Sequence, residues 1–147
     1  GFEARRAFEV AYQQDLEDWK TGPFDGGIYS DGNTYSAEDA QKAFGKAVEH
    51  IKLTFDGAKQ TLDLSGNFEE RSPLTRLPRS IAHCTAIRDL NLSYTMITSL
   101  ELIKNMVGIY VIGIVRKKKS KKLPMICSWI IPLYLVKQVF MAQKLIL

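Results

Sequence analysis

The side chains with the widest chemical repertoire are few in this sequence. It contains two cysteines, Cys84 and Cys127, and two histidines, His50 and His83. A structural zinc site needs four ligands at characteristic spacings, and the adjacent His83 and Cys84 are poorly placed to share one metal. Nucleophilic catalysis needs a base beside the nucleophile, and the sequence has no G-x-S-x-G elbow or catalytic-cysteine signature. We therefore predict no enzyme, no metal site and no cofactor.

A polar stretch over residues 21–35 contains the start of a possible calcium-binding motif. Asp31, Gly32 and Asn33 begin like an EF-hand loop, but Lys42 stands at the twelfth position, where a glutamate is required. The many glycine, aspartate and asparagine residues are instead typical of turns. The sequence predicts a loop here.

The most distinctive local feature is a run of basic residues at positions 116–122. Such runs are found at nuclear-localisation, nucleic-acid and anionic-lipid sites, and equally in solvated loops. No aromatic residue interleaves with the charges, which makes nucleic acid an unlikely partner. The run consists of Arg116, Lys117, Lys118, Lys119, Lys121 and Lys122.

Charge is divided unevenly along the chain. Residues 1–101 carry 16 acidic and 11 basic residues, whereas residues 102–147 carry 9 basic and no acidic ones. Such a tail is typical of a segment that seeks an anionic surface, or of an altered reading of the coding sequence. We therefore expect residues 116–147 to be a basic and apolar tail that is either poorly ordered or non-native.

The tail also supports an alternative function, that of a membrane-associated protein anchored by its C-terminal part. Apolar stretches of ten and fourteen residues flank the basic run, and both are shorter than the roughly 20 residues of a spanning helix. The N-terminal sequence is charged and amphipathic, so it does not support secretion through a signal peptide, and the cytoplasm is the default location.

Two helices are predicted in the first third of the chain. Phe2, Phe8, Tyr12, Leu16 and Trp19 recur at helical spacing within residues 1–20. A second amphipathic helix is expected over residues 36–53. Ser36 is its predicted N-cap, with Asp39 three residues on in place of the glutamate of an ideal capping box.

The remainder of the sequence contains a repeat. TLDLSGN begins at Thr61 and RDLNLSY at Arg88, and both contain the pattern L-x-L-S. Apolar residues follow in two ladders 22 to 23 residues apart, which align Leu90 with Ile112. Leu77-Pro78 adds a further matching step. Over residues 61–115 the chain resembles the leucine-rich repeat family, whose units have this length.

The resemblance implies an α/β fold, a helical N-terminal cap followed by a short leucine-rich repeat solenoid with a curved parallel sheet. The expected divisions are residues 1–57 for the cap, 58–115 for the repeats and 116–147 for the tail. Because so few repeats cannot bury their ends, we expect a portion of a longer protein. The order of elements is similar to bacterial members such as type III secreted effectors, which would make secretion into a host a second expectation for localisation.

The resemblance also implies a binding surface. Residues between the buried leucines of each strand face outward on the concave side of such repeats. Polar and partly acidic residues occupy these positions, which indicates recognition of a protein partner. The predicted partner-binding residues are Thr61, Asp63, Ser65, Asp89, Asn91 and Ser93.

Overall fold

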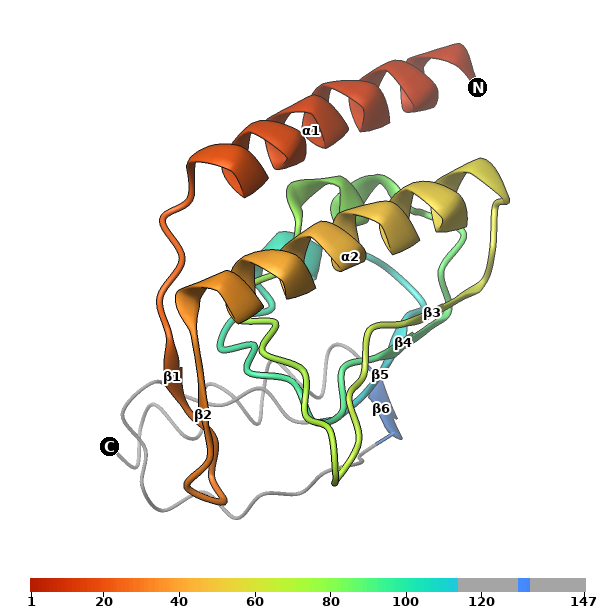
Figure 1. Ribbon diagram of the computed structural model, residues 1–147. Helices are drawn as coiled ribbons and strands as arrows, with labels where there is room; N and C mark the ends of the chain where they lie inside the picture. The colour runs from red at the N-terminus through yellow and green to blue at the C-terminus, as the bar shows by residue number, and fades with distance from the viewer. Residues whose placement is uncertain (114–129, 133–147) are drawn as a thin grey trace.

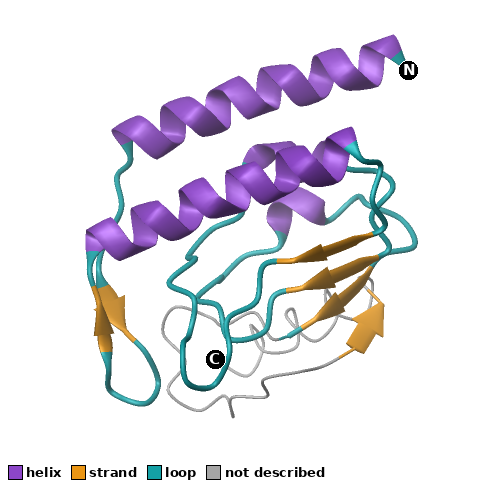
Figure 2. Cartoon of the chain, turned by 45° about the vertical axis from the view of Figure 1, so that its right-hand side comes forward, coloured by secondary structure: helices purple, strands orange, loops and turns teal. Residues whose placement is uncertain are grey.

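The computed structural model describes residues 1–113 and the backbone of residues 130–132. Two long helices, α1 (Phe2–Thr21) and α2 (Ala37–Asp56), run antiparallel on one side of the molecule. A small sheet lies on the side away from α1, and short 3-10 helices lie behind α2 in both views (Figures 1 and 2). Both predicted helices are present, and α2 continues three residues beyond its expected end.

Helix α2 begins with a complete capping box. The Ser36 hydroxyl oxygen accepts a hydrogen bond from the Asp39 backbone N–H, and an Asp39 carboxylate oxygen accepts one from the Ser36 backbone N–H, both at 3.0 Å. The predicted N-cap is therefore confirmed, and the shorter aspartate reaches back as a glutamate would. The helix buries a single apolar face, made by Ala40, Phe44, Ala47, Val48 and Ile51.

Helix α1 packs on the rest of the molecule through a narrow buried face. Its only fully buried residues are Phe8 and Asp15. The Phe8 ring stacks on Phe55 of α2, with ring centroids 4.0 Å apart. The Asp15 carboxylate accepts hydrogen bonds from the backbone N–H groups of Arg79 (2.7 Å) and Ser80 (3.1 Å). These two residues begin the 3-10 helix η1 (Arg79–His83), so α1 caps an element far along the chain.

The segment between the helices contains a hairpin that the sequence did not predict. Strand β1 (Gly27–Ile28) pairs antiparallel with β2 (Thr34–Tyr35). Asp31 stabilises the turn, because its carboxylate accepts from the backbone N–H of Asn33 at 2.9 Å. The expected loop is thus a short two-stranded sheet with a polar turn.

The main sheet has the strand order β3-β4-β5-β6. Strands β3 (Thr61–Asp63), β4 (Asp89–Asn91) and β5 (Tyr110–Ile112) are parallel, and β6 (Ile130–Pro132) pairs antiparallel with β5. Helix η1 precedes β4, and a second 3-10 helix, η2 (Glu101–Ile103), precedes β5. Leu62, Leu90 and Val111 lie in register and are all buried.

The prediction of a leucine-rich repeat solenoid is wrong. The described chain is a small α/β fold with two helices and two short sheets, one of them an antiparallel pair and the other built on a parallel triple. The parallel strands start at residues 61, 89 and 110, so their intervals of 28 and 21 residues do not form a regular period. Strand β6 then enters in the opposite direction, so the parallel stacking required for a solenoid does not continue along the described sheet.

Candidate functional site

Three of the predicted partner-binding residues share one exposed surface. Thr61 and Asp63 on β3 and Asp89 on β4 are exposed, while Leu62 and Leu90 between them are buried. Thr61 is paired directly with Asp89 in the parallel register. Alternation along each strand therefore produces an outward face over a leucine-rich core, as expected.

The side chains of Asp63 and Asn91 help to form the turns that follow their strands. An Asp63 carboxylate oxygen accepts from the backbone N–H of Ser65 at 2.8 Å and from its hydroxyl at 2.5 Å. The Asn91 side-chain oxygen accepts from the backbone N–H of Ser93 at 3.0 Å. The shared pattern L-[D/N]-L-S thus encodes a shared turn, in which the side chain holds the N–H two residues on.

Ser93 does not belong to the outward surface. Only 6% of its surface is exposed. The position corresponds to Ser65, which is partly exposed, but Ser93 follows the inner strand β4 and is covered by neighbouring segments of the chain. Its assignment to a partner-binding face is therefore corrected, whereas Ser65 and Asn91 remain partly accessible there.

On the third strand the outward residues differ from those that the sequence indicated. The repeat aligned Leu90 with Ile112, which would turn Val111 outward. Val111 is instead 1% exposed and pairs with the buried Leu90. Tyr110 and Ile112 take the outward positions, opposite Asp89 and Asn91, and the Tyr110 ring is 45% exposed. We call Thr61, Asp63, Asp89 and Tyr110 the strand face.

A cavity that the sequence did not predict lies beside the strand face. It is a cleft of about 750 Å³ between α2, the β1–β2 hairpin and the loop after β3. The α2 wall includes Lys42, Lys46 and His50, which follow one another at one-turn intervals. The opposite wall is formed by residues 63–67 and 70–74. We call this cavity the α2 cleft.

Arg71 joins two walls of the α2 cleft. Its guanidinium pairs with Asp31 of the hairpin turn at 3.7 Å and donates a hydrogen bond to the Ser30 hydroxyl oxygen. The Tyr29 hydroxyl donates back to the Arg71 carbonyl oxygen at 3.3 Å. These contacts connect residues about forty positions apart in the sequence and fix the hairpin against the loop after β3.

Titratable groups at the cleft are shifted mainly by local causes. Burial raises the pKa of Tyr29 and of Tyr35 above the usual value, so both phenols stay protonated at neutral pH. The hydrogen bonds from Ser36 lower the pKa of Asp39. The cleft therefore presents neutral phenols beside lysine side chains and the ionised carboxylate of Asp39.

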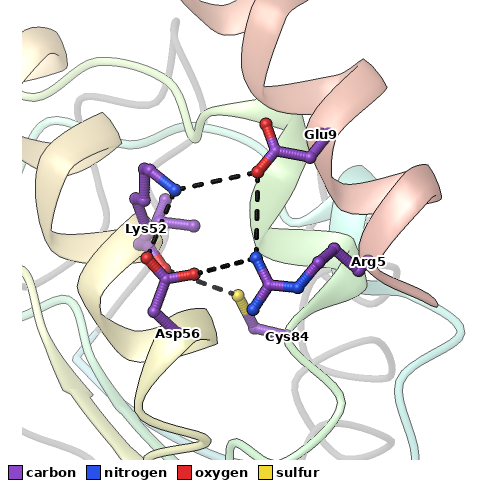
Figure 3. Close-up of polar contacts among 6 residues, drawn as sticks. Arg5, Glu9, Lys52, Asp56 and Cys84 are labelled. Atoms are coloured by element: carbon purple, nitrogen blue, oxygen red, sulfur yellow. Dashed lines mark hydrogen bonds and ion pairs between the residues drawn. The ribbon is translucent and has the colours of Figure 1, made fainter. Parts of the chain in front are cut away.

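A polar cluster at the other end of α2 connects the two helices. The cluster contains four ion pairs of 3.2 to 3.9 Å, two of them within a single helix (Figure 3). The other two cross between the helices and join Arg5 to Asp56 and Glu9 to Lys52. The side chains are between 33% and 56% exposed. Solvent screens such pairs, so they orient α1 more than they stabilise it.

Cys84 lies below this cluster and behaves as a core residue. It is 3% exposed, and its sulfur lies 3.8 Å from the carbonyl oxygens of Ile51 and Ser80. Burial raises the pKa of the thiol to about 12. Cys84 therefore packs as a small hydrophobic residue of the core.

The predicted basic patch lies outside the described residues, from Arg116 to Lys122, and so does Cys127. Within residues 1–113, no group of three His, Cys, Asp or Glu side chains is arranged to hold a metal ion. None of the helices in the described part of the chain has both the length and the apolar character needed to cross a bilayer.

The fold and these surfaces define a small α/β protein with an acidic outward sheet face and a lysine-lined cleft. The chain matches no protein-family model, no curated protein and no solved structure.

Proposed function

We propose that this chain is a protein-binding module that recognises its partner through the strand face. The observation that carries the proposal is the in-register row of Thr61, Asp89 and Tyr110, with Asp63 beside it. Exposed tyrosine side chains are enriched at protein interfaces, since the ring supplies contact area and the hydroxyl a hydrogen bond.

The charge of this face favours a basic segment of the partner. Asp63 and Asp89 are both exposed, and among the described residues neither forms an ion pair. Asp89 pairs with Tyr110 in the sheet register, and both residues are exposed. A lysine or arginine of a partner would gain a carboxylate and an aromatic face at one place.

A selected peptide tests the proposal. Random peptides displayed on phage are selected on the immobilised full chain, and the enriched sequences are expected to carry lysine or arginine near an apolar residue. Their affinity for the Asp89→Lys variant is expected to be at least tenfold weaker, because a positive charge replaces a negative charge on the strand face. Glu49→Lys, an exposed charge reversal on α2, is the matched control.

Amide chemical shifts locate the site independently. The selected peptide should shift the signals of Thr61, Asp89 and Tyr110 in the unaltered chain. Equal affinity for Asp89→Lys and the unaltered chain would contradict the proposal, as would shifts confined to other surfaces.

A further inference from the structure

Strand β3 is the edge strand of the main sheet. The backbone N–H groups of Leu64 and Gly66 donate to the carbonyl oxygens of Asn91 and Ser93, both at 2.9 Å. Backbone groups alternate in direction along an extended chain, so Asp63 and Ser65 direct theirs away from β4. Asp63 already holds the Ser65 N–H through its carboxylate, which leaves the two carbonyl oxygens and the Asp63 N–H on this side.

The α2 cleft begins at this edge. Residues 63–67 form one of its walls, and α2 forms the wall opposite. The volume of about 750 Å³ lies within the range of roughly 300–1,000 Å³ that is usual for ligand sites. Ala43 and Ala47 also line the cleft on α2, and their small side chains leave room between the lysines and the sheet.

The α2 wall presents two lysine side chains to the cleft. Lys42 and Lys46 are exposed, and neither forms an ion pair with a described residue. Asp39 accepts a hydrogen bond from Ser36, and the nearby Lys42 helps to lower the pKa of this carboxyl. Asp63 accepts from Ser65 on the opposite wall. Glu70, on the wall opposite the lysines, adds an exposed negative charge.

We propose that the α2 cleft binds an extended acidic segment of a partner protein, which adds as a strand to the edge of β3 that no described strand occupies. Its backbone bonds to the outward groups of Asp63 and Ser65, as in other cases of strand addition. Its acidic side chains reach Lys42 and Lys46.

The spacing of the lysines supports this geometry. Residues one turn apart on a helix face are about 6 Å apart. Alternate side chains of a strand are about 6.6 Å apart on the same face, so acidic residues at positions i and i+2 of the segment match the two lysines. This inference does not depend on the proposed function, because the strand face is acidic and would select a partner of the opposite charge.

The test uses the full chain and a synthetic peptide in which glutamate alternates with valine. A second peptide of the same composition, with its glutamates contiguous, controls for charge alone. We expect the alternating peptide to bind at least tenfold more tightly and to slow amide exchange at Asp63. The double variant Lys42→Glu and Lys46→Glu should lose this binding, whereas Lys59→Glu, an exposed lysine outside the cleft, should keep it.

The other outcomes overturn the proposal. Equal binding of the two peptides would indicate attraction by charge without strand addition. Displacement of the alternating peptide by millimolar inorganic phosphate would indicate a simple anion site. An equal loss of peptide binding in Lys59→Glu would place the effect outside the cleft. Circular dichroism on each variant verifies that the helices remain folded. Asp89→Lys should leave this binding unchanged, which separates it from the strand face.

Discussion

At the scale of single residues, burial decides what Cys84 can do. A thiolate is the reactive form of cysteine, and the buried sulfur of Cys84 has a pKa of about 12. The thiol therefore stays protonated at neutral pH. In the unfolded chain the pKa returns toward 9.0.

The first prediction follows from this difference. In a Cys127→Ser background, Cys84 of the native protein should resist a thiol reagent near pH 8 and react once urea unfolds the chain. Because the folded pKa is raised, the contribution of Cys84 to stability is constant below pH 9 and is lost as the pH rises from 9 toward 12. Labelling of the native protein at the rate of free glutathione would refute the burial of this thiol.

At the scale of elements, the start of α2 has the best-defined local cause. Two reciprocal hydrogen bonds satisfy backbone donors that would otherwise face water. The cap could be predicted because it depends on residues only three positions apart.

The second prediction concerns this cap. Ser36→Ala should lower the free energy of unfolding by about 1 kcal/mol, because the Asp39 N–H loses its acceptor. Ser36→Asp keeps a side-chain acceptor at the same place and should lose much less. Urea unfolding monitored by helical circular dichroism measures both, and equal losses in the two variants would argue against the capping box.

The register of β5 shows where local patterns become insufficient. Ile109, Val111, Ile112 and Ile114 are all apolar, so either alternation places hydrophobic side chains on the core side. A shift of one residue exchanges the two faces of a strand. The sequence therefore indicated the pairing of Leu90 with Ile112, whereas the sheet pairs it with Val111. On β3 and β4 the polar residues beside each leucine removed this ambiguity.

At the scale of the whole molecule, one core connects the helices to the sheet. Phe8 of α1, Ile51 of α2 and Leu90 of β4 belong to the same buried cluster. The α2 cleft also arises at this scale, because its walls come from segments distant in sequence, and Arg71 pairs with Asp31 across them. No local motif marks such a cavity, so the sequence could indicate the strand face but not the cleft.

The third prediction tests the shared core. Leu90→Asp should remove helical circular dichroism although it changes no helix, because an unpaired carboxylate would enter a fully buried position at a cost of several kcal/mol. Asp89→Lys, on the outward side of the same strand, should melt close to the unaltered chain. Retention of the full helical signal in Leu90→Asp would mean that α1 and α2 are stable without the sheet.

The bond between Asp15 and the start of η1 also constrains the order of folding during synthesis. Its acceptor and its two donors are 64 and 65 residues apart. A ribosome that adds roughly 5–20 residues per second leaves α1 waiting for about 3 to 13 s before Arg79 is made. Helix α1 buries only two residues, and the stacking partner of Phe8 also lies beyond residue 50. Helix α1 is therefore synthesised well before the residues on which it docks.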